Sequence, residues 1–359
     1  MASEEGRNGS LAEESQAWPV ATARRAAVVL NGNAKGVTPR LIDMLEGIVH
    51  EQDLFVSRSL KQGYEISRTI VERRYDTVFT GGGDGTFVQM VSWIAQITPP
   101  QTDLPRFGFL KLGTGNALAW IAGSQDQKPR DIPADLRRAL GGAGDLSLRL
   151  IEAGGLLTPF AGLGADAIAL DHYHQVGRFM RRTALLRPLA SSPFAYAAAI
   201  VGRTMPEFAL AAPLRVTVVN RGEPAQRIGA DGEPQGEPVQ KGEAIYQGSV
   251  RMVAFSTIPY WGFGARIFPD AETRNDRFSL RIADFGGSVV LANVRSIWRG
   301  TFRHPKLQDF LVDAISIECE SATPFQAGGD LLGRRSEIAA RLSDRTVRLV
   351  DFAERAPTR

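Results

Sequence analysis

One short string limits the possible folds of this chain more than any other, Thr-Gly-Gly-Gly-Asp-Gly-Thr at residues 80–86. It follows the β-branched and aromatic run at residues 76–80 and precedes apolar residues at helical spacing in 87–97. Glycines in such a turn let the backbone adopt positive φ and approach a bound group closely, while the first amides of the helix face that group. The string therefore predicts a strand, loop and helix that bind phosphate.

The region around this string alternates between strand-like and helix-like segments. Runs typical of strands lie at residues 26–30, 53–56, 76–80 and 106–110. Residues 38–50 and 62–74 have helical spacing, and Thr38 followed by Pro39 is a typical helix start. This alternation predicts an α/β fold with a doubly wound parallel sheet, a nucleotide-binding domain at residues 24–145.

The pattern of predicted helices and strands changes after this domain. Strand-like runs at residues 146–152, 214–220, 245–255, 278–284 and 315–320 follow one another with few helices between them. We expect a mainly antiparallel, β-rich second domain at residues 146–335, with the active site in the cleft between the domains. Residues 336–359 are expected to return toward the first domain, residues 220–242 to form a solvated loop, and residues 1–22 to be a disordered tail.

Two further loops lie between predicted strands and helices and resemble the first in composition. One contributes Gly113, Thr114, Gly115 and Asn116, and the other contributes Asn31, Gly32, Asn33 and Lys35. The carboxyl ends of neighbouring parallel strands meet at one edge of a sheet, so these loops are expected to converge on one ligand. Lys35 would supply positive charge to a phosphate, although a solvated loop lysine fits the pattern equally well.

Together the three loops resemble those of the diacylglycerol kinase catalytic-domain family, which includes bacterial lipid kinases, sphingosine kinases and ceramide kinases and shares its fold with NAD kinases. The strings at residues 81–86 and 113–116 are specific in combination, and residues 160–166, 259–264 and 269–271 resemble later family stretches. The resemblance implies a lipid kinase that transfers the γ-phosphoryl group of ATP to the hydroxyl of a diacylglycerol-like or sphingoid lipid, with Mg²⁺. It implies nucleotide contacts from Asn31, Gly32, Asn33, Lys35, Gly81, Gly82, Gly83, Asp84, Gly85, Thr86, Gly113, Thr114, Gly115 and Asn116.

The predicted catalytic carboxylates match the family pattern less closely than the three loops do. Where the family has Asp-Gly-Glu near the end of its second domain, this chain has Gly328-Gly329-Asp330, so the resemblance assigns Asp330 as the general base. Asp84 would organise Mg²⁺ or the acceptor hydroxyl, or cap a helix. Where the family has an Asp-Gly associated with Mg²⁺, this chain has Asn275-Asp276, so either Asp276 is an oxygen ligand shifted by one residue or the ion is absent. A second Asp-Gly-Glu at residues 231–233 lies about a hundred residues too early, inside the predicted loop.

Composition excludes several classes of protein. The 359 residues are 43% apolar with no run long enough to span a bilayer, and the formal net charge is only +3, which does not indicate nucleic-acid binding. One cysteine and four histidines provide no disulfide and no ligand spacing for a transition metal. These counts indicate a cytoplasmic protein, and its oligomeric state, homodimer or other, stays open.

Four arginines, Arg178, Arg181, Arg182 and Arg187, alternate with apolar residues. This pattern fits a helix lying on anionic lipid at the inner face of a membrane, and it fits a solvated amphipathic helix equally well. A second contact of this kind would involve Trp298 with Arg295, Arg299 and Arg303 nearby. Residues 260–263 supply aromatic rings either to an acyl-chain pocket or to a packed core.

Two alternatives stay open beside the lipid kinase. A kinase of the NAD kinase type would share the string at residues 81–86, although the later family stretches argue against it. A nucleotide-binding pseudokinase would explain the altered residues 328–330. A Rossmann dehydrogenase is disfavoured, because the first strand is not followed by the expected glycine fingerprint.

Overall fold

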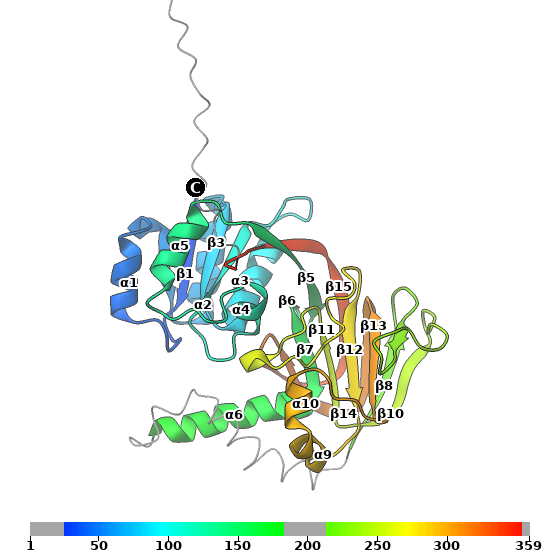
Figure 1. Cartoon of the computed structure of the whole chain (residues 1–359). Helices are drawn as coiled ribbons and strands as arrows, with labels where there is room; N and C mark the ends of the chain where they lie inside the picture. Colours follow the sequence, from blue (N-terminus) through cyan, green and yellow to red (C-terminus); the bar gives the residue numbers. More distant parts are fainter. Residues whose placement is uncertain (1–24, 183–212, 354–359) are drawn as a thin grey trace, which may run out of the picture.

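The computed structural model describes residues 25–182 and 213–353, and the predicted tail at residues 1–22 lies outside this part of the chain. The described strands form one 15-stranded sheet that runs through two lobes lying side by side (Figure 1). In the described residues, no helix combines the length and the apolar character needed to cross a bilayer.

The first lobe contains the predicted parallel sheet, with strand order β2-β1-β3-β4. Its strands are β1 (Ala26–Asn31), β2 (Leu54–Ser57), β3 (Thr77–Gly82) and β4 (Arg106–Lys111). Every residue of β3 is buried, which is typical of a central parallel strand covered on both faces. The α/β prediction for this region is confirmed.

Helices connect these strands and cover the sheet. They are α1 (Pro39–Glu46), η1 (Glu51–Asp53), α2 (Leu60–Glu72), α3 (Asp84–Ile97), α4 (Ala117–Ile121) and α5 (Ile132–Leu140). As predicted, the Thr38 hydroxyl caps α1 by accepting a hydrogen bond from Leu41 N at 3.2 Å. The helix predicted at residues 38–50 ends earlier, because Gly47 forms the C-cap of α1 and a 3₁₀ turn follows.

The second lobe is mainly antiparallel, as predicted. Its strands are β6 (Leu156–Thr158), β7 (Phe160–Gly164), β8 (Leu214–Asn220), β9 (Gln226–Ile228), β10 (Ala244–Val250), β11 (Met252–Ser256), β12 (Phe278–Ala283), β13 (Leu307–Val312) and β14 (Ala314–Ala327). Its helices are α6 (Ala165–Arg182), η4 (Gly262–Gly264), α9 (Gly287–Ala292) and α10 (Val294–Trp298). The single strand predicted at residues 245–255 is two strands, because β10 pairs with β8 whereas β11 pairs with β7 and β12.

Two long strands connect the lobes, β5 (Asp145–Ala153) and β15 (Asp330–Val350) (Figure 1). β15 begins beside β14 in the second lobe, runs along β5, and meets β4 at the Leu349 and Phe107 pair. The segment after residue 335 thus ends in the first lobe, where Phe352 N donates to Ala122 O at 2.9 Å.

The two lobes have separate hydrophobic cores that share the connecting strands. Leu148 and Leu150 of β5 belong to the first core, whereas Ile151 and Ala153 belong to the second. Val347, Leu349 and Val350 of β15 complete the first core together with Phe352. The cavity between the lobes is therefore bounded by elements anchored in both cores.

Candidate functional site

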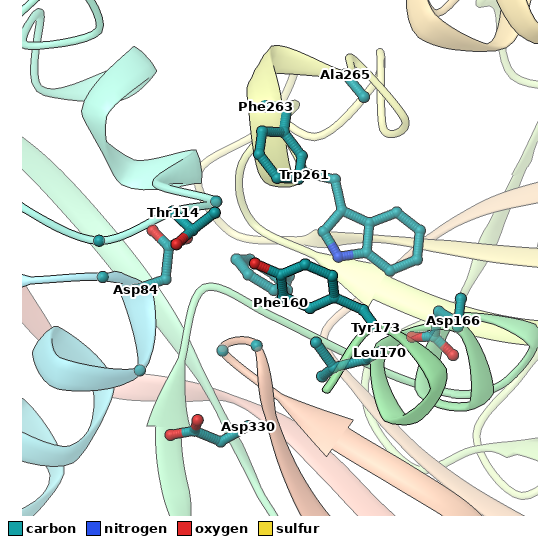
Figure 2. Close-up of a pocket in the computed structure, with 18 of the residues that line it drawn as sticks. Asp84, Thr114, Phe160, Asp166, Leu170, Tyr173, Trp261, Phe263, Ala265 and Asp330 are labelled. Carbon is teal, nitrogen blue, oxygen red and sulfur yellow. The ribbon is translucent and has the colours of Figure 1, made fainter. Parts of the chain in front are cut away.

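A cavity of about 1210 Å³ lies where the carboxyl ends of the parallel strands face the second lobe. The three predicted loops line one end of it. Figure 2 shows Asp84 and Thr114 from the first lobe opposite Phe160, Trp261 and other side chains of the second lobe. Ligands of open α/β sheets bind at this kind of edge.

Ten of the predicted site residues line this cavity. They are Asn31, Asn33, Gly83, Asp84, Gly85, Thr86, Gly113, Thr114, Gly115 and Asp330. The remaining six are not in its lining, namely Gly32, Lys35, Gly81, Gly82, Asn116 and Asp276. Lys35 is exposed, and Arg58, which the sequence reasoning did not single out, lines the cavity beside Asn33 instead.

The glycines of the loops permit close packing, not left-handed backbone. None of those at residues 81–85, 113 or 115 has a positive φ, so this part of the prediction was wrong. A Cβ atom on Gly113 would overlap the backbone of Gly83, and one on Gly82 would overlap the Thr86 side chain. The residue that does adopt φ of 50° is Asn116, whose Nδ2 donates to Gly113 O at 2.8 Å and holds the second loop.

The loop after β1 is tied to the other elements by its amide side chains. Asn31 Nδ2 donates to the Thr86 hydroxyl at 3.1 Å, and Asn31 Oδ1 accepts from Asn33 N at 3.0 Å. Asn33 Nδ2 in turn donates to Arg58 O at 3.0 Å. These bonds fix the loop after β1 against the start of α3. The first amides of a helix attract an anion.

Asp84 is buried, and its carboxylate caps another helix. Its Oδ2 accepts from Ala117 N at 2.8 Å and its Oδ1 accepts from Leu118 N at 2.9 Å, both in the first turn of α4. Burial raises the pKa of Asp84 to about 6, the two backbone hydrogen bonds oppose this shift, and the nearby Asp330 adds to it. Asp84 thus orients the loop that carries Thr114 while standing in the cavity wall.

Asp330 is the first residue of β15 and lies against the glycine loop. A Cβ atom on Gly85 would stand 2.5 Å from Asp330 Oδ2, so any larger residue at this position would displace the Asp330 carboxylate. Burial raises the pKa of Asp330, and a hydrogen bond from the Gln89 side chain opposes the shift. Two carboxylates with raised pKa values therefore stand at the phosphate end of the cavity, a common feature of catalytic sites.

The hairpin before Asp330 has no room for the family's first acidic residue. Gly328 has φ of 59°, and a Cβ atom there would lie 2.5 Å from Val88 Cγ2. An aspartate at this position would need both a strained backbone and a shift of Val88. Asp330 is accordingly the carboxylate that this hairpin presents.

Asp276 stands apart from the cavity. Its carboxylate is about half exposed and accepts two hydrogen bonds from the Arg274 guanidinium, at 2.8 and 2.5 Å. The Arg274 hydrogen bonds lower its pKa, the opposite of the shift at Asp84. No group of three or more acidic, histidine or cysteine side chains within the described residues forms a ready cage for a metal ion.

A third carboxylate, Asp166, stands at the start of α6 in the cavity wall, away from Asp84 in Figure 2. Gln326 Nε2 donates to its Oδ2 at 2.9 Å, and Gln326 Oε1 accepts from Gly329 N at 3.2 Å. Burial raises the pKa of Asp166 to about 6. Gln326 thus ties the hairpin that carries Asp330 to Asp166, a contact between distant residues that the sequence reasoning missed.

The far end of the cavity is mainly apolar, although Arg251 and Arg281 of the second lobe also line the cavity. Its lining there includes Leu170, Tyr173, Met252, Ile267, Phe285, Val290, Leu291, Val294, Ile297, Trp298 and Phe302. Trp261 and Phe263 also line the cavity, and Figure 2 shows them on the side opposite Asp84 and Thr114. Trp261 also packs on Phe268 with ring centroids 6.0 Å apart, as the core alternative predicts, while the acyl-pocket alternative stays a prediction.

The lobes touch beside the second loop. Phe263 N donates to Gly115 O at 2.9 Å, and Tyr260 stacks on Trp120 of α4 with ring centroids 5.4 Å apart. Phe263 has φ of 62°, a strained conformation for a bulky residue that the neighbouring contacts must maintain. Asp84, which caps α4, therefore supports this contact between the lobes as well.

The predicted arginine segment is only partly described. Arg178, Arg181 and Arg182 belong to the last turns of α6, and Arg187 lies outside the described residues.

Comparison with known proteins supports the assignment made from the loops. Residues 25–143 match the model of the diacylglycerol kinase catalytic domain. This match confirms the resemblance indicated by the sequence. A search of the curated proteins finds no match.

Solved structures share this fold over most of the chain. A crystal structure of a diacylglycerol kinase from Bacillus anthracis str. Sterne superposes with a TM-score of 0.55 at 12% identity, covering 91% of this chain and 97% of that one. Two structures described as diacylglycerol kinases of the same organism give 0.62 at 14% and 0.58 at 13% identity, covering 91% of this chain and 97% and 96% of theirs. Together with the domain match, this shared fold supports a transferase of the kinase type.

Proposed function

We propose that the protein is an ATP-dependent kinase that phosphorylates a hydroxyl group of a diacylglycerol-like or sphingoid lipid. One observation carries the proposal, namely that a single cavity joins the glycine loops of the first lobe to an apolar chamber in the second. Phosphate-binding backbone at one end and apolar side chains at the other are what a kinase with a lipid acceptor requires.

The nucleotide would lie at the loop end. The amides that begin α3, together with the backbone at Gly115, would receive phosphate oxygens, whereas Gly113 N already donates to Gly82 O at 2.6 Å. The Thr114 hydroxyl, the Asn33 amide and the Arg58 guanidinium line the same end and add donors. Arg58, which lines the cavity, replaces Lys35, which does not, as the cation that we assign to the phosphates.

The acceptor hydroxyl would lie beside Asp330. This carboxylate contacts the glycine loop at Gly85, so a hydroxyl bound to it stands next to the bound phosphates. Asp330 would orient the hydroxyl and take its proton as the oxygen attacks phosphorus, since a base must be within hydrogen-bond reach. The raised pKa brings its proton affinity closer to that needed near neutral pH.

Mg²⁺ would bind here through phosphate oxygens and one or two carboxylates, because the described residues provide no complete cage. When bound, the ion neutralises charge that develops on the transferred phosphoryl group. Asp330 fits as its protein ligand. Both oxygens of Asp84 already accept backbone hydrogen bonds, so Asp84 would act mainly by holding α4 and Thr114 in place.

The pseudokinase is the second candidate, and one observation favours it. The hairpin at residues 328–330 presents one carboxylate where the family pattern has two, and Gly328 has no space for another. Such a protein would bind ATP through the same loops without transferring phosphate.

The test is a transfer assay with the purified full chain, labelled ATP and Mg²⁺. Acceptors are mixed micelles that contain diacylglycerol, monoacylglycerol, ceramide, sphingosine or phosphatidylglycerol, with NAD as a water-soluble acceptor in parallel. Asp330→Asn and Asp84→Asn are compared with the parent. Asp231→Asn is the matched control, because Asp231 is an exposed carboxylate of the other Asp-Gly-Glu string, at residues 231–233.

We expect one lipid to become labelled, a loss of about 100-fold or more with Asp330→Asn, and parental rates with Asp231→Asn. Binding of ATP with no labelled lipid would support the pseudokinase. Labelled NAD with no labelled lipid would instead indicate the NAD kinase type. Loss of activity with Asp231→Asn would contradict the assignment of Asp330.

A further inference from the structure

The helix pair α9 and α10 is exposed to an unusual degree. No residue of either helix is buried, and neither helix contributes to the hydrophobic cores formed by the described residues. Leu291, Val294 and Trp298 are nevertheless large and apolar, with exposed fractions of 50%, 49% and 44%. Apolar residues at such positions mark a surface that contacts another phase or molecule.

These side chains form one stripe that continues into the cavity. Gly287, Val290, Leu291, Val294, Ile297 and Trp298 all line the cavity and recur at intervals of three and four residues. The stripe therefore occupies one face of the helix pair. It forms the rim of the apolar chamber, with one side toward the cavity and the other toward solvent.

The charged residues of the segment that carries the stripe are all positive. Residues 285–306 contain Arg295, Arg299, Arg303 and Lys306 and no aspartate or glutamate. Arg303 donates to Ala230 O, and Lys306 lies 3.7 Å from Asp284. Arg295 and Arg299 are exposed and make no side-chain hydrogen bond or ion pair within the described residues. An apolar stripe with exposed arginines complements an anionic lipid surface.

We propose that α9 and α10 dock the protein on an anionic bilayer, with Leu291, Val294 and Trp298 inserted among the lipids and Arg295 and Arg299 at the headgroups. In this position the rim of the apolar chamber meets the membrane, and a lipid enters the cavity without crossing water. The entry of lipid rests on the proposed function, whereas the docking itself does not. Figure 1 shows α6 on the same side of the molecule as this pair.

The test measures binding of the full chain to vesicles of phosphatidylcholine with and without phosphatidylglycerol, by sedimentation. Leu291→Ser with Val294→Ser removes apolar contact, and Arg295→Gln with Arg299→Gln removes charge. The control is Leu140→Ser with Arg137→Gln on α5, an exposed leucine and arginine in the other lobe. Thermal unfolding and ATP binding of each variant show that it remains folded.

We expect the parent to bind only the anionic vesicles, at low salt. The serine pair should weaken binding about tenfold or more, the glutamine pair about thirtyfold, and the control pair not at all. In addition, brominated phosphatidylglycerol should quench the fluorescence of the parent more than that of Trp298→Phe, which should still bind.

Equal binding by the parent and both test variants, or equal losses in the control, would overturn the docking surface. So would a dimer that the serine pair converts to a monomer, since the stripe would then face a second copy. Transfer to a short-chain, water-soluble acceptor without vesicle binding would refute the docking alone. Vesicle binding through α9 and α10 without any transfer would refute the proposed function alone.

Discussion

The substitution Gly85→Ala should displace the Asp330 carboxylate while changing the stability of the fold very little. The added Cβ atom would stand 2.5 Å from Asp330 Oδ2 and 2.9 Å from its Cγ. An ordinary contact begins near 3.4 Å, so the carboxylate must retreat by about 1 Å. The end of a side chain can make such a shift, and the backbone of α3 need not move.

Stability should change little, because two effects oppose each other. Alanine in place of glycine in a helix gains about 0.5 to 1 kcal/mol. Displacing Asp330 costs a similar amount, at the lower end of the range for overpacking, about 1 kcal/mol. Catalysis is far more sensitive, since a misplacement of about 1 Å lowers a rate by roughly 100-fold.

The assay combines chemical denaturation with kcat for lipid phosphorylation. Gly47→Ala is the control, because Gly47 caps α1 and its nearest neighbour would be 3.8 Å away. It should leave kcat unchanged. In an Asp330→Ala background, Gly85→Ala should be more stabilising than in the parent, because its Cβ meets no carboxylate. Equal stability effects in both backgrounds, or an unchanged kcat in Gly85→Ala, would refute the reasoning.

Three further predictions follow from the buried charges. Because the pKa of Asp84 is raised to about 6, kcat/KM should fall as the pH drops through about 6, and a fall only near pH 4 would contradict its role as an anion. The pKa of Asp166, raised by burial to about 6, means that the folded protein retains a proton that the unfolded chain releases between about pH 4 and 6. The parent therefore loses stability as the pH rises through this window, and the stability of Asp166→Asn relative to the parent should increase by up to about 3 kcal/mol in denaturation series from pH 4 to 7. Asp309→Ala should cost about 3 to 5 kcal/mol in urea denaturation, because it leaves Arg281, now paired at 2.7 and 2.9 Å, as a buried unpaired charge, whereas Arg281→Met with Asp309→Leu should recover most of that loss.

The first lobe could be predicted from the sequence because its signals are local. Each parallel strand is a short apolar run followed by a glycine or polar loop, and Thr38 and Pro39 mark a helix start. The long strand β15 gave no such signal. It carries many arginines and exposed polar residues, because much of it is a two-stranded connection with one face in solvent.

The candidate site was predictable in composition and less so in geometry. The glycine content of the loops predicts them from sequence. The hydrogen-bond partners of Asp84, however, lie 33 and 34 residues away in α4. Nothing local shows that its carboxylate caps that helix, or that Gln326 connects Asp166 to the hairpin of Asp330. Such contacts depend on how distant segments pack, which one sequence alone does not display.

The path of β15 has a consequence for how the protein is made. The core of the first lobe contains Val347, Leu349, Val350 and Phe352, which lie within the last seven residues that the structure describes. During synthesis from the N-terminus, the sheet of residues 26–111 leaves the ribosome long before these side chains are made. Until then β4 lacks its partner strand β15. Residues 25–143, although they match a family model alone, are therefore not a unit that can complete its own core, and the nascent chain must keep the edge of β4 protected until β15 has been synthesised.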